Sequence, residues 1–189
     1  MNAVTRSFLL SGCVVLIGAC ETINTRSDYD HSVDFSGYDS FAWISDKPMV
    51  VASPEVSPLA QSRIQNAIRR TLESKGMRFV EDATDADFVV GFTVGTRQQV
   101  RVDTTPIYPY PAGYRGPYRW GYPYYQDVDV REYTQGRLAI DVFDAAEKQP
   151  VWHGFATKNI TGADQADPEP LITKAVEAIL KDFPPGTAS

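Results

Sequence analysis

The amino-acid sequence predicts an α+β protein, a two-layer α/β sandwich in which two helices cover one face of a mixed, mostly antiparallel sheet of five or six strands. Two segments carry apolar residues at helical spacing, each in a single stripe. Five or six other segments are rich in β-branched and aromatic residues, or alternate between apolar and polar ones. Because a one-sided helix and a one-sided sheet bury each other's apolar surface, both helices are expected on the same face.

Residues 1–19 have the pattern of a signal peptide. Arg6 supplies one positive charge, and the chain from Phe8 to Ala19 is uncharged and almost wholly apolar. This run is shorter than the roughly 20 residues that a membrane-spanning helix needs, and it ends in small residues as a cleavage site requires. The mature chain is therefore expected to begin at Cys20.

The segment Ile17-Gly18-Ala19-Cys20 resembles the lipobox of bacterial lipoproteins, with an aliphatic residue three positions before the cysteine and small residues between. The resemblance implies a diacylglyceryl thioether on the Cys20 sulfur and an acyl group, such as palmitate, on its amine. Two or more acyl chains anchor a protein stably. Glu21 is not the aspartate that often signals inner-membrane retention, so an outer-membrane, periplasm-facing location is favoured. The alternative is an ordinary secretory signal followed by a coincidental cysteine.

Composition limits the mature chain to one acidic domain. Without residues 1–19 the chain keeps 170 residues, which is enough for a single domain, assigned to residues 38–185. Cys20 is then the last cysteine, which excludes an intrachain disulfide and a cysteine-based metal site. The net charge of −6 becomes −7 once Arg6 is lost. This charge argues against nucleic acid as a partner, because phosphate binding needs a concentrated cationic surface.

The N-terminal part of the mature chain has two interpretations. In the first interpretation, residues 20–37 are a tether that lets the acylated residue reach the bilayer. In the second, Thr22 to Tyr29 form an edge strand of the sheet. The aromatic-rich segment Tyr38 to Ile44 is predicted to be the first strand of the domain. Residues 49–58 are predicted to be a loop, because prolines interrupt them.

The first helix is predicted to run from Pro58 to Gly76. Ser57 is a good N-cap, and proline suits the first helical position, where no N–H is needed. Gly76 is placed to end the helix in the left-handed conformation. The apolar stripe consists of Ala60, Ile64, Ala67, Ile68 and Leu72.

The remaining strands surround a central one. Residues 88–94 are dense enough in apolar side chains for a strand that is covered on both faces. The alternation of polar and apolar residues over 95–102 indicates that this strand runs past the edge of the core. The other predicted strands are 79–80, 127–133 and an antiparallel hairpin of 136–143 with 151–157.

A second helix follows a polar loop. Asp167-Pro168 is predicted to open it, with the aspartate as the cap, and Pro184-Pro185 to stop it. Its buried stripe is Ile172, Ala175, Val176, Ile179, Leu180 and Phe183.

Residues 106–125 interrupt the strand pattern. They hold seven of the ten tyrosines, five prolines and three glycines, a composition that is typical of a long loop. Its rings could stack on sugars or prolines, and its arginines could pair with carboxylates or phosphates. The alternative is that the loop folds back over the open sheet face and buries its own rings. The candidate ligand-binding residues are Tyr108, Tyr110, Tyr114, Arg115, Tyr118, Arg119 and Trp120.

Candidate catalytic groups are few. Asp85 and Asp87, and likewise Asp127 and Asp129, would each share one face of an extended chain, where they could bind calcium or act as an acid/base pair. Such aspartates more often cap strand ends. The histidines, His31 and His153, come with no nucleophile-elbow motif, so a structural role is favoured for His153. We predict no catalytic residue, no metal site and no cofactor.

Several short motifs resemble, in their order and spacing, the bacterial lipoprotein family that carries the domain of unknown function 4136. The motifs are Asp28-Tyr29-Asp30, Asp34-Phe35, Tyr38 through Trp43, Ala86-Asp87-Phe88, and Gly136 through Val142 paired with Val151-Trp152-His153-Gly154. They span nearly the whole mature chain. The family has no established activity, so the resemblance implies the class of protein and adds no catalytic residue.

These observations predict a lipid-anchored cell-envelope protein with a non-catalytic binding or structural role. The lipid on Cys20 would contact the membrane, and residues 106–125 would contact an envelope protein or a glycan. The alternative is a periplasmic hydrolase that uses carboxylates near Asp127 and Asp129. A deep pocket lined by both aspartate pairs would favour the hydrolase.

Overall fold

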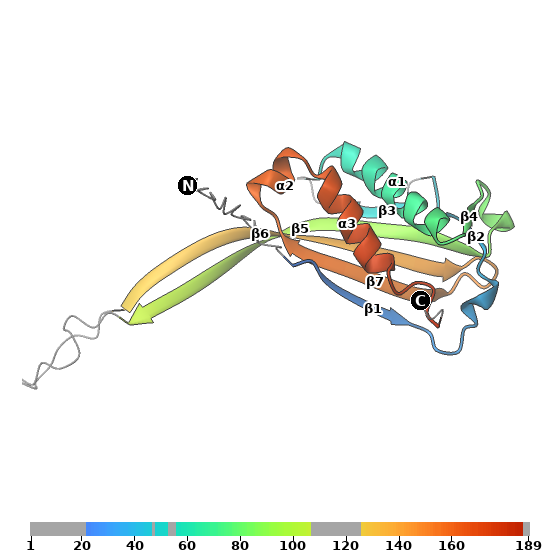
Figure 1. Ribbon diagram of the computed structural model, residues 1–189, viewed down its shortest axis with the longest axis horizontal. Helices are drawn as coiled ribbons and strands as arrows, with labels where there is room; N and C mark the ends of the chain where they lie inside the picture. The colour runs from blue at the N-terminus through green and yellow to red at the C-terminus, as the bar shows by residue number, and fades with distance from the viewer. Residues whose placement is uncertain (1–21, 47, 53–55, 107–125, 187–189) are drawn as a thin grey trace, which may run out of the picture.

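The computed structural model describes residues 22–46, 48–52, 56–106 and 126–186, which form a two-layer α+β fold (Figure 1). The sheet runs in the order β1-β7-β6-β5-β2-β4, and β3 also pairs with β5. Its strands are β1 (Asn24–Tyr29), β2 (Ser40–Trp43), β3 (Met49–Ala52), β4 (Arg78–Phe79), β5 (Phe88–Pro106), β6 (Gln126–Asp144) and β7 (Pro150–Asn159). The helices are α1 (Pro58–Ser74), α2 (Gly162–Ala166) and α3 (Glu169–Leu180).

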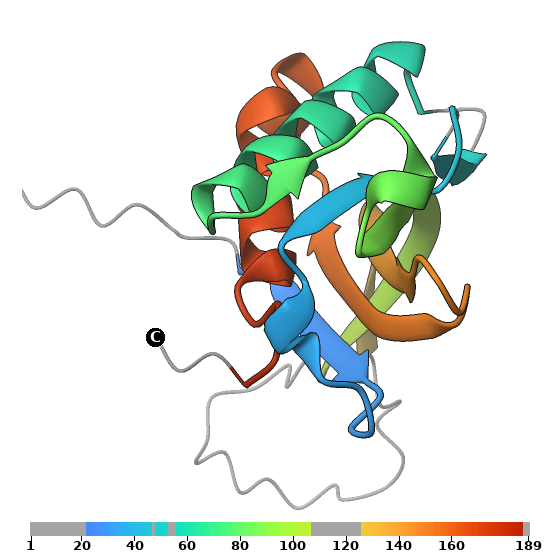
Figure 2. The ribbon, with the colours of Figure 1, turned by 90° about the vertical axis from the view of Figure 1, so that its right-hand side faces the viewer.

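The sheet is mixed, as the sequence predicts. The pairs β1–β7, β7–β6 and β6–β5 are antiparallel, whereas β5–β2, β5–β3 and β2–β4 are parallel. Helices α1 and α3 lie side by side on one face of the sheet (Figures 1 and 2). The predicted α+β class and the placement of both long helices on one face are therefore confirmed.

The core lies between these helices and the sheet. The predicted stripes of both helices face it, and the sheet contributes buried aromatic and β-branched residues. Phe183, just after α3, closes one end, with its ring centroid 5.2 Å from that of Trp152 and 5.4 Å from that of Phe88. The largest fully buried side chains are Phe41, Phe88, Phe92, Phe183, Ile64, Ile68, Leu72, Ile140, Leu180, Val90, Val142 and Val176.

The predicted ends of α1 are confirmed. The Ser57 hydroxyl accepts a hydrogen bond from the Leu59 N–H at 3.3 Å, and Pro58 occupies the first helical position. Gly76 has a φ of +93°, the left-handed region that glycine adopts without strain.

The loop predicted at residues 49–58 is partly wrong, because β3 lies within it. The backbone of Met49 aligns with Phe92 and that of Ala52 with Val94, in a parallel pairing. Four residues are too few to show a period of their own. Their strand character depends on the neighbouring β5, which no local pattern reveals.

The predicted start of the second helix is also wrong. The N-cap position of α3 is Pro168, which makes no side-chain capping bond. Asp167 instead ends α2, where its N–H donates to the Ala163 carbonyl at 3.0 Å. The segment predicted to be a polar loop forms α2, because Thr161 and Asp164 make a reciprocal capping box.

Of the two interpretations of residues 20–37, the structure has the edge strand over Asn24–Tyr29. It pairs with β7 in the register Asn24↔Thr157 to Tyr29↔Trp152. Cys20 lies outside the described residues.

β5 and β6 extend far beyond the other strands and form a two-stranded arm (Figure 1). They pair without interruption from Phe88↔Asp144 to Pro106↔Gln126, so the segments predicted at 127–133 and 136–143 are one strand. The pairing of β3 ends at Val94 and that of β7 at Gln135. We call residues 97–106 with 126–134 the arm. It continues the central strand past the core, as the alternation over 95–102 predicts.

Candidate functional site

The described residues enclose a half-open cavity of about 550 Å³ where the arm leaves the body. One wall is the sheet, and the others are the first turns of α1 and α3 together with α2. This volume falls in the range of pockets that hold small ligands. Apolar wall residues include Ile23, Ala60, Ile64, Val94, Leu138, Ala156, Ile160, Leu171, Ile172 and Ala175.

Small side chains help to leave this space open. Ala60 on α1, Ala175 on α3 and Ala156 on β7 all line the cavity. Gly136 on β6 also lines it, and a Cβ at that position would lie 2.7 Å from the Ile160 Cδ1. The Ile160 side chain therefore packs directly on the Gly136 backbone.

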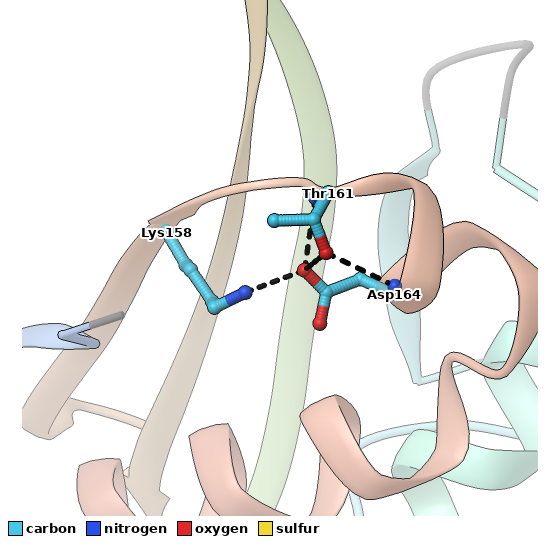
Figure 3. A network of polar contacts seen from close by, with 3 residues as sticks. All are labelled: Lys158, Thr161 and Asp164. Carbon is cyan, nitrogen blue, oxygen red and sulfur yellow. Dashed lines mark hydrogen bonds and ion pairs between the residues drawn. The ribbon is translucent and has the colours of Figure 1, made fainter. Parts of the chain in front are cut away.

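A partly buried ion pair forms one polar wall (Figure 3). The Lys158 Nζ lies 2.5 Å from the Asp164 Oδ2, and the two side chains are only 12% and 17% exposed. The same carboxylate oxygen accepts hydrogen bonds from the Thr161 hydroxyl at 2.7 Å and from the Thr161 N–H at 2.9 Å. This network ties the end of β7 to the start of α2.

The charge of Asp164 is fully engaged by this network. Burial raises the pKa of its carboxyl, but the hydrogen bonds from Lys158 and Thr161 outweigh that effect and lower the pKa below its usual value. Asp164 is thus held as a carboxylate that accepts three hydrogen bonds. We assign it a structural role.

Three cationic residues line the cavity. Lys158 is paired with Asp164, and the Arg137 guanidinium lies 4.3 Å from the Phe155 ring centroid, which leaves Arg63 to meet a ligand. It projects from α1, is half-buried and lines the cavity. Within the described part of the chain its guanidinium pairs with no carboxylate. The site therefore combines a largely apolar volume with cationic side chains, of which Arg63 is the one that we assign to a ligand.

None of the predicted site residues that the structure describes lines this cavity. Cys20 and the seven ring and arginine positions from Tyr108 to Trp120 lie outside the described residues, so their roles stay predictions. The two aspartate pairs lie at opposite ends of the β5–β6 ribbon, since Phe88 pairs with Asp144 and Thr105 with Asp127. At about 3.3 Å per residue this places them roughly 50 Å apart.

One aspartate of each pair, Asp87 and Asp129, has a local structural partner. Asp87 accepts hydrogen bonds from Ser40, and Asp129 pairs with Arg131 on its own strand at 2.6 Å. The condition that would favour the hydrolase, one deep pocket lined by both pairs, is not met.

The two histidines make contacts on the surface. The His153 Nδ1 lies 2.6 Å from the Asp141 Oδ1 of the neighbouring strand, and the His31 ring packs 4.2 Å from that of Tyr29. Among the described residues, no group of three or more His, Cys, Asp or Glu side chains could hold a metal ion. Within the same residues, no helix has the length and apolar character to cross a membrane.

Sequence reasoning missed the cavity. The available signal was weak: alanines occupy stripe positions on both long helices, at Ala60 and Ala175. Small residues at such positions also occur in tightly packed helix pairs, so only the three-dimensional arrangement distinguishes a void from a close contact.

Comparisons with solved structures find similar bacterial proteins. A DUF4136 family protein from Bacteroides thetaiotaomicron is 18% identical, with a TM-score of 0.53, covering 86% of this chain and 96% of that one. The PelC dodecamer from Paraburkholderia phytofirmans is 13% identical (TM-score 0.45; 84% and 95% covered). A putative neuraminyllactose-binding hemagglutinin homolog from Helicobacter pylori is 14% identical (TM-score 0.44; 78% and 83% covered).

No curated protein matches the chain at a significant level. The family model of the domain of unknown function DUF4136, in contrast, matches residues 25–185. This range covers the seven strands and three helices described above except Asn24, the first residue of β1. The motifs from Asp28 to Gly154 that resemble this family lie within the match. The chain belongs to the DUF4136 family.

Proposed function

We propose that this protein is a lipid-anchored cell-envelope protein of the periplasm-facing outer membrane, with a non-catalytic role. Its cavity would bind one hydrocarbon chain of an amphipathic ligand that carries an anionic head group. The observation that carries the proposal is the largely apolar cavity of about 550 Å³ between the helices and the sheet.

The physical argument starts from the cavity walls. Each methylene that moves from water into an apolar site contributes about 0.8 kcal/mol, so a long chain gains affinity quickly as it enters. Arg63 at the wall supplies a cation for a carboxylate or phosphate head. An amphipathic anion fits this combination better than a sugar does, because a sugar needs many polar partners.

The anchor would bring the cavity close to such ligands. Ile23 lines the cavity and follows Cys20 by three residues, a reach of roughly 10 Å for an extended chain. The hydrocarbon could therefore come from a membrane lipid or from the lipid on Cys20 itself. The experiment below distinguishes these two sources.

The binding test uses a chain that starts at residue 21 and is exported by an ordinary secretory signal, with a fluorescent long-chain fatty acid as the probe. Ala60→Phe places a ring in the cavity and should weaken binding at least about 10-fold. Leu59→Phe is the matched control, because Leu59 is the preceding residue and is 63% exposed. It should bind like the unsubstituted chain. Equal binding by Ala60→Phe would contradict the proposal.

Two further measurements test the head group of the ligand and the source of its hydrocarbon chain. Arg63→Gln should weaken binding of the fatty acid but leave binding of the corresponding fatty alcohol unchanged, because only the acid carries the charge. If the anchored full chain does not bind a probe that the anchor-free chain binds, the lipid on Cys20 occupies the cavity. If both bind it, the ligand comes from elsewhere.

The anchor itself is tested by Cys20→Ser in the full chain. Without the thiol no thioether can form, so the chain should stay unprocessed, fail to incorporate labelled palmitate and leave membranes in carbonate. Continued extraction by detergent alone, together with palmitate labelling, would exclude Cys20 as the lipid site.

A further inference from the structure

The arm leaves a strand edge unpaired. From Arg97 to Pro106, β5 pairs with β6 on one side and with no described strand on the other. A row of free backbone N–H and C=O groups along such an edge is a template for another strand. A two-stranded ribbon is also only marginally stable alone, and a third strand would stabilise it.

One face of the arm is apolar and exposed. Val102 lies directly opposite Val130, and Val100 and Val128 lie diagonally beside them on the same face. These four valines are 53–59% exposed. The same face of the sheet forms the core nearer the body, so the valines continue an apolar surface past the end of the core.

The other face carries charges in an unfavourable register. Arg101 lies directly opposite Arg131, and Asp103 directly opposite Asp129. Like charges in this arrangement destabilise a hairpin. Each arginine instead pairs along its own strand, with 3.0 Å from Arg101 to Asp103 and 2.6 Å from Arg131 to Asp129. Within the arm, the directly opposite pairs therefore have like charges, and the cross-strand attraction runs only along the diagonal between Arg131 and Asp103.

A second copy of the chain would place unlike charges directly opposite each other. If two β5 edges pair antiparallel about a two-fold axis at Val102, Arg101 of each copy faces Asp103 of the other. The two valines at 102 then meet, and Val100 faces Thr104 of the second copy. In such an isologous interface, the same residues of both copies form the contacts. We propose that residues 99–105 of β5 form this interface with the same residues of a second copy.

The β6 edge fits less well. A two-fold axis at Val130 would also oppose Asp129 and Arg131 of two copies, but it would place Val128 opposite Glu132. The β5 edge has no such mismatch on its apolar face. Pairing through β5 builds a four-stranded sheet whose central row is Val130, Val102 and their two counterparts.

Charged residues on an edge can instead serve to prevent pairing. Edges protected in this way repel a second copy, whereas this edge places opposite charges together under the two-fold axis. The two interpretations differ in what a single charge reversal does.

Disulfide crosslinking of the full, membrane-attached chain tests the interface. Val102→Cys should form a covalent dimer on mild oxidation, because opposed residues lie about 5 Å apart at Cα. Val130→Cys is the matched control, since the two valines are 56% and 57% exposed. Its counterparts would lie about 14 Å apart, three strand spacings, which is too far for a disulfide. Equal crosslinking at both positions, or none at Val102→Cys, would overturn the proposal.

Charge reversals in the Val102→Cys chain provide the second measurement. Arg101→Asp alone, or Asp103→Arg alone, makes both cross-strand pairs repulsive and should lower the crosslink yield about 10-fold. The double variant Arg101→Asp, Asp103→Arg restores opposite charges and should recover the yield. Arg131→Asp makes the same change in net charge on β6 and should have no effect. Single reversals that leave the yield unchanged or raise it would show that the charges do not join two β5 edges.

Discussion

At the residue scale, Asp87 shows how a candidate catalytic carboxylate serves the fold. Its Oδ2 accepts hydrogen bonds from the Ser40 hydroxyl at 2.6 Å and from the N–H groups of Ser40 and Asp39 at 2.7 Å and 3.1 Å. Ser40 is buried, so its hydroxyl needs this partner. The carboxylate thereby joins the entry of β5 to the start of β2. The sequence allowed either a ligand-binding or catalytic carboxylate or a cap at the end of a strand, and these contacts favour the cap.

These bonds give Asp87 a predictable pH dependence. The hydrogen bonds, led by that of the Ser40 hydroxyl, lower the pKa of Asp87 below 3.8. Because the folded pKa is depressed, its stabilisation is present above about pH 4 and is lost as the pH falls through the folded pKa. Asp87→Asn should lower the free energy of unfolding by about 1 kcal/mol at pH 7, and the difference should shrink below pH 4.

Urea unfolding at several pH values measures this effect. Asp85→Asn is the matched control, because Asp85 is the other aspartate of the same motif and its carboxylate makes no hydrogen bond within the described chain. A loss for Asp87→Asn that stays constant from pH 7 to pH 3 would contradict the assignment.

At the element scale, the packing of α3 on the sheet depends on a glycine. Trp152 and Gly154 follow each other on the helix-facing side of β7, and the Trp152 indole crosses the glycine beneath α3. A Cβ on Gly154 would lie 2.2 Å from the Trp152 Cη2 and 2.8 Å from the Ile179 Cγ2. Trp152 is 2% exposed, so its ring has little room to move.

Gly154→Ala should therefore push α3 from the sheet and lower the free energy of unfolding by about 1–3 kcal/mol. Gly95→Ala, in β5 of the same sheet, is the matched control, because a Cβ there meets nothing within 4 Å. It should be neutral or stabilising by a few tenths of a kcal/mol, since alanine restricts the unfolded chain more than glycine does. Thermal unfolding of both variants gives the comparison, and similar melting temperatures would show that the indole can yield.

The elements that could be predicted from the sequence are those whose own residues show a pattern of apolar and polar side chains. Three local patterns predict an element and its buried face: the stripe of α1, the alternation of 136–143 and the apolar run of 88–94. In contrast, β3 becomes a strand because β5 is beside it. Asp167 ends α2, which begins with a capping box, and so does not cap α3. The cavity was not predictable for a related reason, because it is the space left between elements and belongs to no single residue.

At the scale of the whole molecule, the chain consists of a packed body and an exposed arm. The body holds the buried core and the cavity, whereas the four arm valines are more than half exposed. No described side chain of the arm belongs to the hydrophobic core, so the arm contributes little to the stability of the body. Its length, its valine face and its free edge are better explained by contact with another molecule, as the paired β5 edges would provide.

Replacing residues 99–133 by Asn-Gly tests this division of the molecule. Gln98 and Thr134 face each other in the ladder, so a two-residue hairpin turn can join them without changing the register. The body should remain folded, with a melting temperature within about 4 °C of the intact chain, because the change in free energy should stay below about 1 kcal/mol. It should still bind the fatty-acid probe, since Arg63 and Ala60 stay in place. A drop of more than about 10 °C, or an unfolded chain, would show that the arm stabilises the core and would weaken the case for its role in association.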